Sequence, residues 1–165
     1  MNELILSKLD VHTLSGSGGV VGGFRRKVDA TKFGTATADT ETLSSADSGT
    51  LFTVNGTLDN IVNLPALSTS NVGLAYEFVW TVANASGKTC TFVLPGAGVS
   101  NFYAVINLSG ATGVATQTYA VAGDVLTIPA AVVAGASVIL TCIADDGTNS
   151  TWTAVTVSSV IATVA

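Results

Sequence analysis

From about residue 40 to its end, the chain is a series of short segments rich in valine, threonine, isoleucine and aromatic residues, separated by turn-forming residues. The clearest is YEFVWTV, residues 76–82, in which every second residue is bulky and apolar: Tyr76, Phe78, Trp80 and Val82. An alternation with a period of two places these side chains on one face of a strand. No segment shows the spacing of an amphipathic helix. Roughly eight or nine such strands predict an all-β domain, either a jelly-roll-like β-sandwich or a small antiparallel barrel.

Two motifs predict where strands turn. The dipeptide Asn55-Gly56 follows the apolar segment 51–54, and it is favoured in two-residue β-hairpins. The segment DDGTNS, residues 145–150, separates the strand-like segments 136–144 and 152–157. Because Asp and Gly supply the backbone geometry of tight turns, we expect a hairpin there as well.

The first part of the chain has a different character. Its segment GSGGVVGGFRRKVDATKF, residues 16–33, is rich in glycine, and five of the six lysine and arginine residues occur by residue 32. Glycine-rich segments are flexible. We therefore predict a flexible, basic N-terminal arm over residues 1–38 and an all-β domain over residues 39–165.

The chain carries few charges for its size. Asp, Glu, Lys and Arg make up 10% of the residues and apolar residues 48%, whereas typical globular domains are about 25% charged. Such a composition excludes intrinsic disorder, and a surface with so few charges tends to associate. We therefore expect a homo-oligomer or a member of a larger assembly.

Two classes of partner are not expected. The net charge is −5, and binding of nucleic acid requires a concentrated cationic face. The longest apolar tract, residues 128–140, is interrupted by Pro, Gly and Ser, and it is shorter than the roughly 20 residues of a membrane-spanning helix. The first ten residues also lack the pattern of a secretory signal.

No combination of residues indicates catalysis. The single histidine, His12, falls in the predicted arm, where a Ser-His-Asp or Cys-His site would lack fixed geometry. Asp145 and Asp146 occur in the expected turn, without the alternating oxygen ligands of a calcium loop. Cys90 and Cys142 have neither metal-binding nor redox spacing. We interpret them as buried strand residues, and the sequence leaves open whether they pair. We expect no enzyme, no cofactor and no metal site.

Two stretches resemble bacteriophage virion proteins. TETLSSADSGTLFTVNGTLDNIVNLPAL, residues 40–67, is similar to an opening in which a T-L-[ST]-x-A-D-S-G phrase leads to a strand, a turn and a short strand closing on Leu-Pro. VLTIPAAVVAGASVILTCIADDGTNSTWTAV, residues 125–155, resembles their closing hairpin with its DGTNW-like turn. Here Ser150 and Thr151 stand between Asn149 and Trp152, so the turn departs from that pattern.

These phrases occur in capsid decoration (cement) proteins and also in tail-fibre and tail-spike modules, so the resemblance implies a phage structural protein. We expect a capsid decoration protein that is assembled in the host cytoplasm and lies on the outer surface of the virion. It is expected to be a homotrimer that binds the major capsid protein and ties capsomers together through its N-terminal arm. The alternative is a tail-fibre, spike or adhesin module that binds host surface glycans, for which exposed aromatic residues would be needed.

The predicted capsid contacts lie in the arm, where basic and apolar side chains are interleaved. Arginine can form bidentate pairs with carboxylates of the partner, and apolar side chains can then anchor the arm. The expected contact residues are Phe24, Arg25, Arg26, Lys27, Lys32 and Phe33. Deletion of residues 1–33 is accordingly expected to leave the β oligomer folded.

Overall fold

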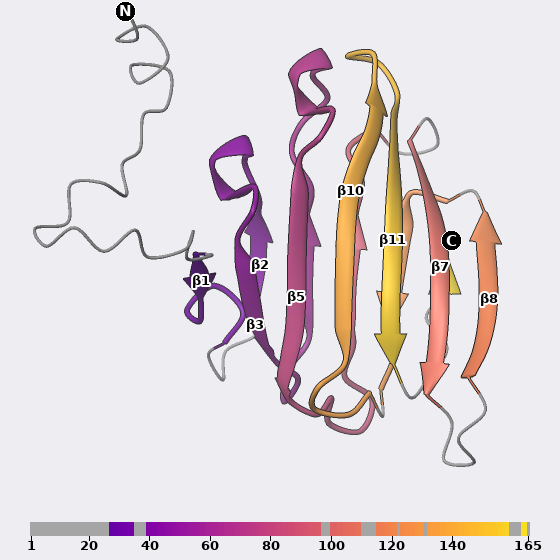
Figure 1. Ribbon diagram of the computed structural model, residues 1–165. Coiled ribbons are helices and arrows are strands. Elements are labelled where there is room, and N and C mark those ends of the chain that lie inside the picture. The colour runs from indigo at the N-terminus through magenta and orange to yellow at the C-terminus, as the bar shows by residue number, and fades with distance from the viewer. Residues whose placement is uncertain are drawn as a thin grey trace, which may run out of the picture.

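The computed structural model describes residues 27–34, 39–96, 100–109, 115–121, 123–130, 132–158 and 163–164. These residues form β-strands and two short 3-10 helices, arranged in two sheets (Figure 1). The elements are β1 (Val28–Asp29), β2 (Asp39–Thr42), η1 (Ser45–Asp47), β3 (Leu51–Asn55), β4 (Asn60–Asn63), η2 (Thr69–Asn71), β5 (Ala75–Val82), β6 (Cys90–Val93), β7 (Asn101–Ser109), β8 (Ala115–Val121), β9 (Val125–Ile128), β10 (Ser137–Asp145), β11 (Ser150–Ser158) and β12 (Thr163–Val164). The fold is all-β, as predicted.

Both sheets combine parallel and antiparallel pairs. Sheet A has the strand order β1-β3-β5-β10-β11-β7-β8, and sheet B has the order β12-β9-β6-β4-β2. From β2 to β7 the chain alternates between the sheets, so a strand that returns to its own sheet runs in the same direction as the previous one. For this reason β3 and β5 are parallel in sheet A, and β2, β4 and β6 are parallel in sheet B. Neither sheet is therefore antiparallel throughout.

The β10–β11 hairpin lies in the middle of sheet A, between β5 and β7 (Figure 1). β10 is antiparallel to both of its neighbours, and β11 is parallel to β7. Asp145 and Ser150 pair across the end of the hairpin, which confirms the turn predicted over residues 145–150. Both strands of this hairpin thus have a neighbouring strand on each side, although β5 pairs with β10 only over Ser137–Thr141.

The core lies between the two facing sheets. Tyr76, Phe78 and Trp80 of β5 are buried, which confirms the alternation predicted for them. Phe78 meets Phe92 of β6 with ring centroids 4.7 Å apart, so aromatic contacts join sheet A to sheet B. Trp152 of β11 is also buried and stacks on Tyr76 with centroids 5.9 Å apart.

The structure differs from the prediction at the end of β5. The pairing of β3 with β5 slips after Val54, which lies opposite Trp80, so that the next residue, Asn55, lies opposite Val82. This irregularity ends the strict alternation. Val82 is consequently exposed, although the sequence pattern placed it on the buried face.

The predicted hairpin at Asn55-Gly56 is also wrong. β3 ends at Asn55 in sheet A, and β4 begins at Asn60 in sheet B, so the chain crosses between the sheets at this point. Gly56 is buried, and a Cβ atom there would overlap Asn84. Glycine is required because the backbone of the crossing passes close to another segment, and not because a tight hairpin forms.

Residues 27–34 belong to the β domain. β1 pairs in parallel with β3, and the carbonyl of Lys27 accepts a hydrogen bond from the amide of Leu51 at 2.9 Å. The carbonyl of Phe33 accepts another from the amide of Asn55 at 2.7 Å, and the Phe33 side chain is fully buried. The predicted arm boundary at residue 38 is therefore too late in the chain. The expectation that the β oligomer stays folded without residues 1–33 is corrected too, because this deletion would remove the buried Phe33 side chain.

Candidate binding surface

The predicted capsid-contact residues divide into three groups in the structure. Phe24, Arg25 and Arg26 lie outside the described residues, so their predicted role stays a prediction. Lys27 is exposed beside the edge of sheet A. Lys32 and Phe33 are held by contacts within the β domain, which differs from their predicted role in binding a capsid.

Phe33 lies in an aromatic cluster. Its ring is 5.6 Å from that of Phe52 and 5.8 Å from that of Phe78, measured between centroids. The Phe33 side chain has no exposed surface, so it is not available for contact with another protein. Its sequence context, between a basic run and a threonine-rich segment, did not reveal this because a single apolar residue has no periodicity.

Lys32 forms an ion pair with Asp47 at the end of η1. Its ammonium group lies 3.2 Å from the carboxylate and 5.9 Å from the centroid of the Phe52 ring. Burial alone would raise the pKa of Asp47. Hydrogen bonds from the amide and hydroxyl of Ser44, together with Lys32, lower that pKa below its usual value. Lys32 therefore fixes η1 against β3, and its charge is already neutralised within the domain.

The described lysines do not form a basic patch. Lys88 forms a second ion pair, in which its ammonium nitrogen lies 3.0 Å from a carboxylate oxygen of Asp59. Both residues are far from the predicted arm in the sequence. Lys32 is paired to Asp47, and Lys27 is exposed. Any basic docking site would therefore draw on Lys27 together with the cations that lie outside the described residues, Lys8, Arg25 and Arg26.

A different surface emerges on the outer side of sheet A, the side that faces the viewer in Figure 1. Four apolar side chains there are exposed by 39–45% of their surface, and they come from three adjacent strands of the sheet. We call these residues the apolar face: Tyr103, Ile139, Val155 and Val157. Ile139 lies opposite Val155 across the β10–β11 pair, so the exposed side chains are neighbours and not scattered.

The local sequence explains why this face is apolar. β10 buries Val138 and Leu140 in the core while Ile139, between them, points outward. β11 likewise buries Trp152 and Ala154, and Val155 follows on the outer side. Strands that are apolar on both sides are typical of sheets covered on both faces. Apolar residues at the outward-facing positions of β10 and β11 are thus the sequence signal for this surface. A prediction of strands alone does not use that signal.

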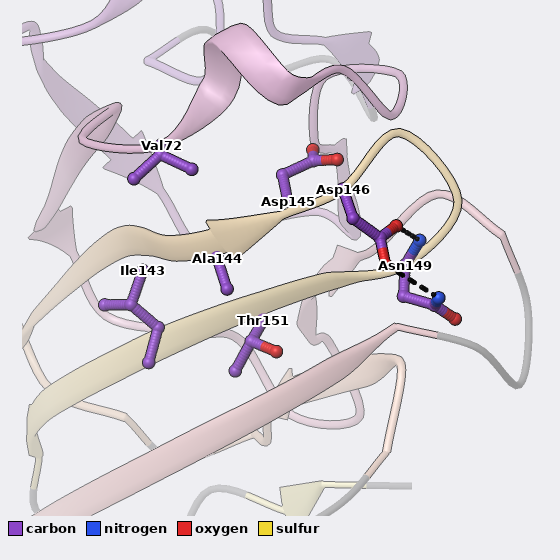
Figure 2. A pocket seen from close by; sticks show the side chains of 7 residues that line it. All are labelled: Val72, Ile143, Ala144, Asp145, Asp146, Asn149 and Thr151. Carbon is purple, nitrogen blue, oxygen red and sulfur yellow. Dashed lines mark hydrogen bonds between the residues drawn. The ribbon is translucent and has the colours of Figure 1, made fainter.

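A hollow of about 400 Å³ lies at the end of the apolar face, beside the β10–β11 turn (Figure 2). Its apolar lining includes Val72, which follows η2, and Ile143 and Ala144 of β10. The pairing of β10 with β11 shifts between Cys142 and Ala144, so Ile143 is an extra residue on its strand. Such a bulge redirects side chains, and both Val72 and Ile143 are about half exposed here.

The two carboxylates beside the hollow have structural roles. Asp145 is buried and accepts hydrogen bonds from the amide of Ser68 and the side-chain amide of Asn71, at 3.1 and 2.9 Å. These bonds tie η2 to the hairpin. Hydrogen bonds from the amides of Asn149 and Thr148 lower the pKa of Asp146 and close the turn. Neither carboxylate is arranged with a second group for acid-base chemistry.

Both cysteines are buried, and they are not joined in a disulfide. Cys90 and Cys142 are free thiols inside the domain, which confirms their interpretation as buried strand residues. Burial raises the pKa of Cys90, and burial together with the Asp145 carboxylate raises the pKa of Cys142 to about 11. Within the described residues, no three His, Cys, Asp or Glu side chains form a group that could hold a metal ion.

Among the described residues, no helix has the length and apolarity needed to cross a membrane. Comparisons of the chain with protein-family models, curated proteins and solved structures give no significant match.

Proposed function

We propose that this chain is a structural protein of a phage virion, which decorates the outer surface of the capsid as a homotrimer bound to the major capsid protein. Two lines support the proposal. The stretches 40–67 and 125–155 resemble phage virion proteins, and the folded domain presents an apolar face in a chain with few charges. The apolar face carries the proposal, because exposed apolar side chains gathered on one side mark a surface that is covered in the working assembly.

The glycan-binding alternative receives no support from the described aromatic residues. Stacking on a sugar requires an exposed ring, yet Tyr76, Trp80 and Trp152 are buried. Tyr103 is the one aromatic residue with large exposure among those whose side chains are described. It lies opposite Thr153 of β11, and no second exposed aromatic ring among the described side chains is available beside it to form a platform for a sugar.

The role proposed for the arm is now confined to residues 1–26 and the exposed Lys27. Phe24, Arg25 and Arg26 remain the proposed capsid anchors, with the arginines pairing with carboxylates of the major capsid protein. Exposed pairs of this kind steer and orient a complex more than they add affinity. We therefore propose that the arm orients the protein on the capsid and that apolar contacts keep it bound.

A cryo-EM map of virions of the phage that encodes this chain tests the proposal directly. We expect density for a two-sheet domain outside the capsid shell, repeated at the local three-fold positions. Density for this domain on the tail would reject decoration in favour of a tail structure, and its absence from the virion would reject both.

A binding assay separates the contribution of the arm. Capsids that lack the protein are mixed with the wild-type chain, with the chain lacking residues 1–26, and with Arg25→Ala/Arg26→Ala, and bound protein is measured after sedimentation. We expect strong loss for the deletion and partial loss for the double substitution. Lys88→Ala, which removes a cation far from the arm in sequence, is the control and should bind as wild type does. Equal binding by all variants would reject the role of the arm.

A further inference from the structure

We propose that the outer side of sheet A is the surface through which copies of this chain associate, so that a second copy covers the apolar face of the first. The inference rests on the homo-oligomer in the proposed function and assigns the surface that forms it. The occupant is a second copy of the same chain, and the argument comes from the pattern, the extent and the charge of this surface.

The pattern is a continuous row of apolar side chains. In the middle of sheet A, Ile139 of β10 lies opposite Val155 of β11, which in turn lies opposite Val105 of β7. The rows on either side add Val157 and Tyr103 on the same two strands. One row is therefore apolar across β10, β11 and β7, and in the rows beside it Val157 lies opposite Ser137 and Tyr103 lies opposite Thr153.

The extent matches what a stable contact between chains requires. Strands β5, β10, β11 and β7 have eight or nine residues each. With about 4.8 Å between strands and about 3.4 Å per residue, they cover roughly 19 by 30 Å, or about 600 Å². A stable interface buries about 800 Å² on each partner. The flanking strands β3 and β8 extend the sheet enough to supply the difference.

The charge of this surface favours an identical partner. Strands β5, β10, β11 and β7 carry no lysine or arginine, and Lys27 adjoins β1 at the edge of sheet A. The carboxylates near these strands are Glu77, which pairs with Ile139 across β5 and β10, and Asp146 at the hollow. An anionic partner would find no cation there, and a strongly cationic partner would leave the apolar rows uncovered. The apolar side chains of a second copy complement this row, and Glu77 at its β5 end is the charged group that the contact must accommodate.

The outer side of sheet B provides a natural contrast. Its exposed aliphatic residue, Ile61 of β4, is as exposed as Ile139, at 40% against 42%. However, Ile61 pairs with Thr40 on one side and Thr91 on the other. It is thus a single apolar side chain among threonines, whereas Ile139 belongs to an apolar row.

This contrast gives the test a matched control. The full-length wild type, Ile139→Asp and Ile61→Asp are compared by size-exclusion chromatography with light scattering at micromolar concentration, with circular dichroism to confirm folding. We expect the wild type and Ile61→Asp to have a mass that is a multiple of 16.5 kDa, and Ile139→Asp to have the mass of one chain. A monomeric wild type would overturn the inference, and so would dissociation by Ile61→Asp with Ile139→Asp still associated.

A milder variant keeps the test informative if Ile139→Asp does not fold. Val155→Thr preserves the β-branched shape but places a hydroxyl group in the contact. We expect its dissociation constant to rise by about tenfold or more, measured by sedimentation equilibrium. An unchanged dissociation constant would exclude Val155 from the contact and overturn the assignment.

Residues 1–26 of the same chain are the competing occupant. If they cover the apolar face, the wild type would be a monomer and deletion of these residues would create an oligomer, which overturns the inference. The proposed function can fail while this inference holds, and the experiments distinguish the two cases. An oligomer that depends on Ile139 but does not bind capsids would keep this inference and reject decoration.

Discussion

Phe33 packs edge-on against Phe52, with ring centroids 5.6 Å apart and ring planes 77° apart. Edge-to-face geometry is favourable for aromatic pairs, and both side chains are fully buried. This contact fastens the segment 27–34 to sheet A, next to the pairing of β1 with β3. The β domain therefore includes residues 27–34, and the candidate arm is shorter than its composition indicates.

The first prediction concerns this contact. Phe33→Ala should lower the free energy of unfolding by about 3–5 kcal/mol, the range for truncating a buried phenylalanine. Denaturant unfolding followed by tryptophan fluorescence measures it. Deletion of residues 1–26 is the control and should leave the unfolding midpoint unchanged, whereas deletion of residues 1–34 should lower it at least as much as Phe33→Ala. Equal stability of the two deletions would place Phe33 outside the core.

The second prediction concerns the buried hydrogen bond between Trp80 and Asn84. The indole N–H of Trp80 donates to the side-chain oxygen of Asn84 at 2.8 Å, and the Asn84 amide donates to the carbonyl of Pro129 at 3.0 Å. Asn84→Ala leaves the indole N–H unpaired in the core and should cost about 1–3 kcal/mol. Trp80→Ala, which also opens a cavity, should cost about 3–5 kcal/mol.

A double-mutant cycle with Asn84→Ala and Trp80→Phe isolates this hydrogen bond. The cost of Asn84→Ala should be smaller in the Trp80→Phe background, because no indole N–H is then left unpaired. Additive costs would show that the bond contributes nothing beyond packing.

The third prediction concerns pH and Asp47. The pKa of Asp47 is lower in the folded state than its ordinary value of 3.8, since the hydrogen bonds from Ser44 and the charge of Lys32 outweigh the effect of burial. A carboxyl group with a lowered folded-state pKa stabilises the fold above its unfolded pKa. That contribution is lost as the pH falls below 3.8 and through the folded-state pKa.

Asp47→Asn tests this dependence. At pH 7 it should lower the free energy of unfolding by about 1–3 kcal/mol, and the difference from wild type should shrink as the pH falls below about 4. Asp59→Asn, whose carboxylate is much more exposed, is the comparison and should have a smaller effect at pH 7. A difference for Asp47→Asn that does not change with pH would contradict the role assigned to its charge.

The fourth prediction concerns the thiols. Burial raises the pKa of Cys90 and raises that of Cys142 to about 11, and the thiolate is the reactive form. A disulfide-exchange reagent at pH 8 should therefore label neither cysteine in the native protein and both after unfolding in guanidinium chloride. Fast labelling of the native protein would show that one of the two thiols reaches solvent.

The sequence determined those features that depend on neighbouring residues. The alternation of Tyr76, Phe78 and Trp80 depends only on the period of a strand, and these side chains are buried as predicted. The DDGTNS turn depends on backbone preferences of Asp and Gly within six residues, and it closes β10 onto β11. The all-β class follows from the same local patterns.

The tertiary structure alone decided how distant segments meet. A strand pattern does not state which strand it pairs with, because any strand offers the same backbone donors and acceptors. The crossing at Gly56 between sheets, the placement of β10–β11 between β5 and β7, and the burial of Phe33 therefore could not be read locally. The apolar face arises in the same way. Tyr103, Ile139 and Val155 are far apart in the chain, and only the pairing of β7, β11 and β10 makes them one surface.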